Sequence, residues 1–118
     1  MQRQIPVMGE VRQVKDVPAE LVKMCADELD AIRLCIQLSR YTHDFIREQL
    51  GIDKGHFSRM MQGQAGFPTS KRVALMSLCG NRAPAQYEAM RLGCELVELS
   101  KDEQIRELEK QLAALKAA

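Results

Sequence analysis

Five residues within the nine-residue segment 54–62 suit close contact with the edges of nucleic-acid bases. They are Lys54, Gly55, His56, Arg59 and Gln62. Lysine and arginine can donate to O6 and N7 of guanine, and glutamine can pair with adenine. Histidine near the start of a helix can reach a base edge or a phosphate, and glycine lets the helix backbone come close to the DNA. If the segment is one helix, this set would face the major groove.

Candidate phosphate contacts lie within this segment and on both sides of it. They are Thr42, His43, Ser58, Gln64, Ser70, Lys71 and Arg72. Thr42 and His43 stand where a helix is expected to begin and where free backbone N–H groups would meet a phosphate. Two alternatives stay open: Ser58 can instead bond another helix, and one of Lys71 and Arg72 is expected to face away. Neither His43 nor His56 is expected to bind a metal, because no second ligand has suitable spacing.

The residues between these polar positions predict two short helices joined by a tight turn. Thr42 and Asp53 are suitable N-caps for helices that reach about Leu50 and about Gln62. Gly51 permits the positive φ of a sharp turn. The apolar positions that would anchor the pair are Ile46, Leu50, Ile52, Phe57 and Met60. The second helix would then turn its polar face outward, as an element that enters the major groove must do.

This segment resembles the helix-turn-helix of the lambda-repressor-like (Cro-type) family of phage and bacterial regulators. The matching positions are Thr42, Ile46, Leu50-Gly51-Ile52, Phe57-Ser58-Arg59 and Gly63, and the resemblance covers roughly residues 31 to 79. It implies that residues 54–62 form a recognition helix. Arg47 departs from the family pattern because a small residue is usual there, and Phe45 departs because an exposed polar residue is usual. We expect Arg47 to extend to solvent or phosphate, and Phe45 to pack on the N-terminal arm or the last helix.

The remaining sequence predicts an all-α fold of four to five helices with a C-terminal helix or short coiled coil. Further helices are expected over residues 19–39, from Thr69 or Ser70 to Gly80, and over residues 85–99 after Pro84. Residues 100–103 have the form of a capping box that restarts or bends the chain into a last helix. The expected organisation is an extended arm (1–17), a helix-turn-helix domain (18–82) and a dimerisation segment (83–118).

The last helix has a seam of apolar residues that suits self-association. Its members are Ile105, Leu108, Leu112 and Leu115, which make about two heptads. We expect a homodimer contact there, supported by Met90, Cys94 and Val97 of the preceding helix. Packing against its own domain is the alternative. Two copies would read an inverted repeat with half-sites about one helical turn apart.

Composition narrows the class of protein. The chain has 118 residues, 46% of them hydrophobic, and a net charge of +1, but residues 40–72 carry +3 and residues 95–118 carry −2. Four cysteines (Cys25, Cys35, Cys79 and Cys94) include no Cys-x-x-Cys pair and are interpreted as small buried apolar residues in a reducing cytoplasm. No signal peptide and no apolar stretch of the roughly 18 residues that a membrane requires is found. A cytoplasmic, nucleoid-associated protein without cofactor or metal is expected.

These observations favour a sequence-specific transcription regulator, by default a repressor of phage or mobile-element type. Its expected partners are double-stranded DNA, a second copy of itself and RNA polymerase, with Asp44 and Glu48 as the candidate polymerase contacts. The alternative is a protein-interaction module, such as an antitoxin or a host-protein inhibitor, that works through the tail and Phe45. An enzyme is not expected, because no carboxylate pair, nucleophile–base pair or phosphate-binding glycine loop has a recognisable setting.

Overall fold

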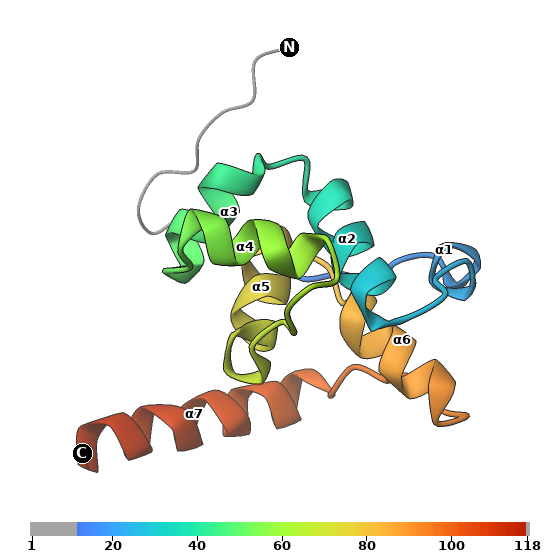
Figure 1. Cartoon of the computed structure of the whole chain (residues 1–118). Helices are drawn as coiled ribbons and strands as arrows, with labels where there is room; N and C mark the ends of the chain where they lie inside the picture. Colours follow the sequence, from blue (N-terminus) through green and yellow to red (C-terminus); the bar gives the residue numbers. More distant parts are fainter. Residues whose placement is uncertain (1–11, 118) are drawn as a thin grey trace.

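The computed structural model describes residues 12–117, and the regular structure of this part is helical (Figure 1). The helices are α1 (Ala19–Lys23), α2 (Glu28–Ser39), α3 (His43–Leu50), α4 (Lys54–Met61), α5 (Arg72–Cys79), α6 (Ala83–Arg91) and α7 (Lys101–Ala117), with a short 3-10 helix, η1 (Thr69–Lys71), directly before α5. The only β contact among the described residues is an isolated bridge between Lys15 and Asn81. The predicted all-α class is confirmed for this part of the chain.

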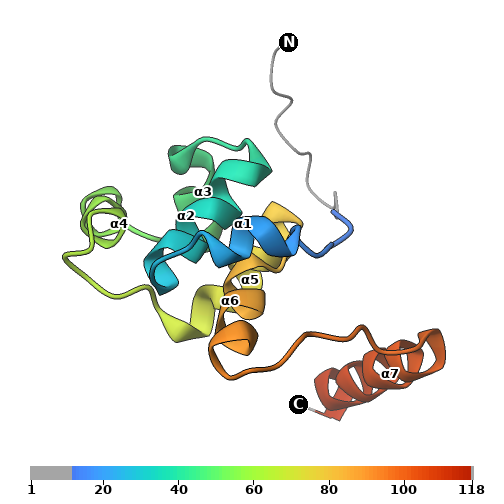
Figure 2. The same cartoon turned by 90° about the vertical axis from the view of Figure 1, so that its right-hand side faces the viewer.

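The core lies around α2, which packs against α6 and α5 and occupies the middle of the body (Figure 2). The side chains that α2 buries include Ala31, Ile32, Cys35 and Ile36. Leu75 of α5 is fully enclosed, as are Ile46 of α3 and Met60 of α4. Removal of this apolar surface from water is the main stabilising term, and the same cluster fixes α3 and α4 on the body.

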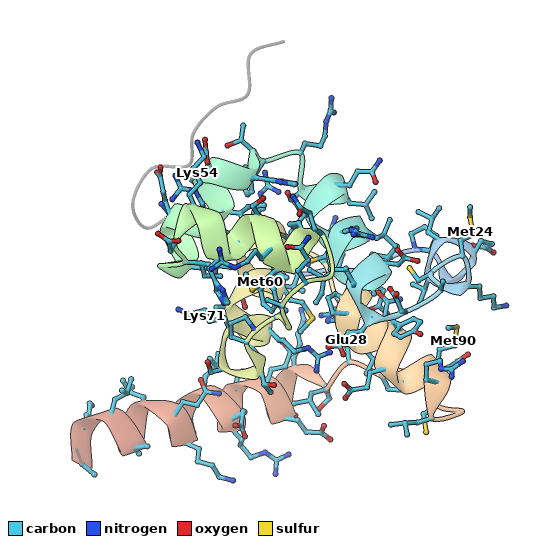
Figure 3. The ribbon with its side chains drawn as sticks, in the orientation of Figure 1. Met24, Glu28, Lys54, Met60, Lys71 and Met90 are labelled. Carbon is cyan, nitrogen blue, oxygen red and sulfur yellow. The ribbon has the colours of Figure 1, made fainter. Side chains whose placement is uncertain are left out.

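The single helix predicted over residues 19–39 is wrong, because the chain breaks between α1 and α2. Asp27 is extended (φ −152°), and its carboxylate accepts a hydrogen bond from the Asp30 amide at 2.8 Å. The Asp30 carboxylate accepts in turn from the Ala26 amide at 2.8 Å. This reciprocal cap begins a new helix, and it leaves Met24 79% exposed at the end of α1 (Figure 3).

The helix predicted over residues 85–99 is also wrong in length, because α6 ends at Arg91. Gly93 has φ +75°, and the Cys94 amide donates to the Ala89 carbonyl at 2.8 Å, which closes the helix end. Residues 94–100 are not helical. Cys94 and Val97 therefore do not continue the face of Met90, and Val97 is 85% exposed. The predicted support of the dimer contact by one continuous helix face is lost.

The last helix begins where the capping pattern predicts. The Ser100 hydroxyl accepts a hydrogen bond from the Glu103 amide at 3.2 Å, and α7 follows without interruption. No side chain of α7 is buried. The helix lies on the side of the body remote from α4 (Figure 2). The side chains of its apolar seam are 52–74% exposed, so no described part of the chain covers the seam.

The described part of the predicted N-terminal arm is extended and attached to the body. The Lys15 amide donates to the Gly80 carbonyl, and the Arg82 amide donates to the Lys15 carbonyl, both at 3.1 Å. Arg12 donates to the Ser39 carbonyl at 3.0 Å, and its guanidinium lies 3.8 Å from the centre of the Tyr41 ring. Residues 12–17 thus belong to the packed body, whereas residues 1–11 of the predicted arm lie outside the described residues.

The four cysteines are free thiols in different settings. Cys35 and Cys79 are buried as predicted, Cys25 is half-buried, and Cys94 is exposed, so the prediction of burial is wrong for Cys94. A hydrogen bond with Cys79, together with burial, holds the pKa of the Cys35 thiol far above its ordinary value. Burial and the nearby Asp30 and Asp27 carboxylates also raise the pKa of Cys25.

Candidate nucleic-acid interface

Helices α3 and α4 are joined by a three-residue turn whose geometry matches the sequence prediction. The Thr42 hydroxyl caps α3 by accepting from the Phe45 amide at 3.0 Å. Gly51 has φ +68°, in the left-handed region. The Asp53 carboxylate caps α4 by accepting from the amides of Gly55 and His56 at 3.1 and 3.2 Å. Both helices therefore begin, and α3 ends, at local signals in the sequence.

The predicted apolar anchors all lie beneath this pair of helices. Ile46, Leu50, Ile52, Phe57 and Met60 are buried. His43 adds a ring contact, because its imidazole meets Phe57 edge-on with 5.4 Å between ring centres. With the anchors on one side of α4, its other side is free to face solvent.

The predicted base-reading residues share this outer side of α4. Lys54, Gly55, Arg59 and Gln62 are exposed and His56 is half-buried; Figure 3 shows Lys54 near the start of the helix and Met60 below it. A Cβ placed on Gly55 would lie 3.5 Å from an Arg59 guanidinium nitrogen, so Arg59 folds back over the glycine. The helix thus presents two cations, an imidazole and an amide on one surface.

Ser58 joins this surface through a bond within α4. The Gln62 amide nitrogen donates to the Ser58 hydroxyl at 3.2 Å. The alternative of a bond from Ser58 to another helix is therefore not what the structure shows. The contact holds the Gln62 side chain along the exposed face of α4.

The candidate phosphate contacts divide into exposed and engaged residues. Thr42, His43, Gln64 and Ser70 are exposed near α3, α4 and η1. Lys71 is half-buried, and its ammonium group donates to the Leu50 carbonyl at the end of α3 (Figure 3). A cation at this position satisfies a carbonyl that the helix leaves unpaired.

Arg72 is the member of the Lys71–Arg72 pair that faces away. Its guanidinium lies 3.3 Å from a Glu28 carboxylate oxygen and 2.9 Å from a Glu88 carboxylate oxygen, and its side chain is only 18% exposed. It joins α5 to α2 and α6. The structure therefore does not bring Arg72 to the surface formed by α4.

Arg33 is a residue of the site that the sequence reasoning missed. From α2, its guanidinium donates twice to the Met61 carbonyl, once from Nε at 3.1 Å, and it pairs with Asp30 at 3.4 Å. Met61 is the last residue of α4, so Arg33 caps the helix that Asp53 begins. No local signal marks it, because 28 residues separate donor and acceptor.

The two departures from the family pattern have simple packing explanations. Arg47 pairs with Asp44 at 2.9 Å and with Glu48 at 3.6 Å on its own helix. The hydrogen bond from Arg47 and its charge lower the pKa of the Asp44 carboxyl. Phe45 packs on Tyr41, with 4.8 Å between ring centres, rather than on the last helix.

Comparisons with protein-family models, with curated proteins and with solved structures each found no match. Among the described residues, no helix has both the length and the apolar composition needed to cross a membrane. No three His, Cys, Asp or Glu side chains of residues 12–117 are grouped closely enough to hold a metal ion.

Proposed function

We propose that this chain binds double-stranded DNA, reads it with the outer face of α4 in the major groove, and regulates transcription as a homodimer. One observation carries the proposal: α4 exposes Lys54, Arg59 and Gln62 together while its opposite side is anchored in the core. These side chains supply the donors and the amide that distinguish guanine and adenine.

The shape of the pair α3–α4 supports the lambda-repressor-like interpretation. The caps at Thr42 and Asp53, the positive φ of Gly51 and the buried anchors occur at the positions where the resemblance needs them. In such a pair the second helix enters the groove and the start of the first approaches the DNA backbone. The exposed Thr42 and His43 are the proposed phosphate contacts of α3, and Ser58, Gln64, Ser70 and Lys71 those of α4 and the segment after it.

Repression by occupying a promoter is the proposed default. The proposed contact with RNA polymerase is the exposed acidic pair of Asp44 and Glu48, which both lie beside Arg47 on α3. Arg47 neutralises part of that pair, so this contact is the weaker element of the proposal. A second copy joined through Ile105, Leu108, Leu112 and Leu115 would present a second α4 to the other half of an inverted repeat.

The test is a selection of random duplex DNA by the purified protein at near-physiological salt. The wild type should enrich an inverted repeat. Arg59→Ala should relax one position of each half-site and weaken binding about 5- to 150-fold for each half-site, the range for one bidentate base contact. Arg91→Ala removes an exposed arginine from the end of α6 and should leave both the motif and the affinity unchanged. Binding should fall steeply as salt rises, because phosphate contacts release counterions.

A second function is favoured by one separate observation, the exposed apolar seam of α7. A protein-interaction module such as an antitoxin or a host-protein inhibitor would use this seam on a foreign partner. DNA reading would be rejected in favour of this second function if the folded wild-type protein enriches no DNA motif and shows no salt-dependent binding to duplex DNA.

A further inference from the structure

The seam of α7 is an amphipathic face without a partner. Ile105, Leu108, Leu112 and Leu115 are 52–74% exposed, and the rest of α7 is polar or alanine. α7 has 17 residues, and helices in proteins gain most of their stability by packing an amphipathic face. Figure 1 shows α7 as a separate rod below α5. An aligned apolar stripe on such a rod needs a complementary apolar stripe.

The charges beside the seam decide which orientation of a second copy fits. If the seam residues occupy positions a and d, then Asp102, Glu109 and Lys116 follow one flank, and Gln104 and Gln111 follow the other. In a parallel pair each flank meets the opposite flank of the other helix. Every such contact then involves a glutamine, so no ion pair forms. At the start of the seam the two Lys101 residues, one from each copy, would also face each other and repel.

An antiparallel pair brings each flank against the same flank of the other copy. Ile105 then lies opposite Leu115, and Leu108 lies opposite Leu112, so all seam residues are covered. Asp102 of each copy faces Lys116 of the other, which gives two attractive contacts. At the centre of the pair the two Glu109 residues, one from each copy, face each other and make one repulsive contact. The charges therefore favour the antiparallel orientation.

The size of the body favours the same orientation. The chain, α7 included, extends 39 × 36 × 33 Å, so the body attached to each α7 is wider than the spacing of two packed helices. In the antiparallel pair the two Lys101 residues are about 27 Å apart along the axis, since each residue contributes about 1.5 Å. In the parallel pair they are only about 8–10 Å apart, and two bodies would compete for one space. Because α7 lies away from α4 (Figure 2), antiparallel pairing also leaves both α4 faces open.

We propose that two copies of this chain associate through an antiparallel pair of α7 helices, and that this pair spaces the two α4 helices. The inference rests on the homodimer of the proposed function and names its geometry. The occupant of the seam is the α7 helix of a second copy, held by apolar contact along the seam and by the Asp102–Lys116 contacts at both ends.

Cysteine cross-linking in a Cys94→Ser background tests the orientation, since α7 is exposed and its substitutions do not touch the core. Ile105→Cys and Leu115→Cys proteins are oxidised with diamide separately and as a mixture, and dimers are counted on a non-reducing gel. We expect covalent dimers in the mixture and only background in each separate protein. Covalent dimers of Ile105→Cys alone would show a parallel pair and overturn the proposal.

Charge reversal gives a second measurement. Asp102→Lys should weaken self-association about tenfold in sedimentation equilibrium, and Asp102→Lys combined with Lys116→Asp should restore it. Equal loss in the single and double variants would overturn the antiparallel contact.

The outcomes separate this inference from DNA reading. A monomer that still enriches a half-site in the DNA selection would overturn the α7 pair but keep the base-reading role of α4. An antiparallel dimer that enriches no motif would keep the pair and reject DNA reading.

Discussion

Helices α4 and α7 both expose a long face, but the two faces have opposite chemistry. α4 exposes cations and an amide and buries Phe57 and Met60, whereas α7 exposes four leucine or isoleucine side chains and buries none. α4 is also held at both ends, by Asp53 and by Arg33 from α2. The side-chain contacts at the start of α7 are local: the Ser100 hydroxyl accepts from the Glu103 amide, and the Gln104 side chain donates to the Leu99 carbonyl. A polar exposed face can be complete within one chain, whereas an apolar exposed face calls for another molecule.

The largest expected effect on the free energy of unfolding comes from truncating one apolar side chain in each region to alanine. Ile46→Ala removes a fully enclosed side chain beneath α3 and should lower the free energy of unfolding by about 2–5 kcal/mol. Leu112→Ala should change it by less than about 0.5 kcal/mol in dilute, monomeric protein, while weakening self-association. Urea unfolding followed by circular dichroism measures the first quantity and sedimentation the second. Equal destabilisation by both variants would mean that α7 packs on the body, contrary to the comparison.

Removing the N-cap of each helix sharpens the same contrast. Asp53→Ala leaves the first amides of α4 unpaired and should lower the free energy of unfolding by about 0.5–2 kcal/mol. Ser100→Ala should fray α7 but leave the cooperative unfolding of the body unchanged. Hydrogen exchange of the first amides in α4 and α7 follows each loss directly. A drop in body stability with Ser100→Ala would show that the two regions unfold together.

A smaller effect is expected at the far end of α4. Arg33→Ala leaves the Met61 carbonyl without its cation and should cost about 0.5–1 kcal/mol of stability, since the side chain is partly exposed. DNA binding should weaken as well, although Arg33 lies on α2. Arg106→Ala, which removes an exposed arginine of α7, is the matched control. Unchanged DNA affinity with Arg33→Ala would remove the role of this cap in positioning α4.

The smallest effect concerns the pH dependence of α3. Because Arg47 lowers the pKa of Asp44 in the folded protein, the contact stabilises the fold above the ordinary aspartate pKa of about 3.9. That contribution is lost as the pH falls through the lowered folded value. NMR titration of the Asp44 carboxyl should give a midpoint below the ordinary value, and Arg47→Met should raise it toward that value. An unchanged midpoint in Arg47→Met would assign the shift to another cause.

The boundaries of α3 and α4 were predictable because the groups that set them are local. Thr42, Asp53 and Gly51 act within three residues of the amides and carbonyls that they satisfy or redirect. The same locality applies to Ser100 at the start of α7. The breaks at Asp27 and Gly93 are equally local, but the sequence interpretation predicted one unbroken helix across each of them.

What the sequence by itself determined is therefore the set of helices around the turn, their caps and the polar face of α4. Only the tertiary structure decided how distant side chains are used. Arg33 reaches the end of α4, Lys71 reaches the end of α3, and Arg72 turns toward Glu28 and Glu88. Three cations of similar chemistry meet different partners because the packing of α2 and α5 fixes where each stem begins. A cap depends on neighbours along the chain, whereas these contacts depend on which helices the core brings together.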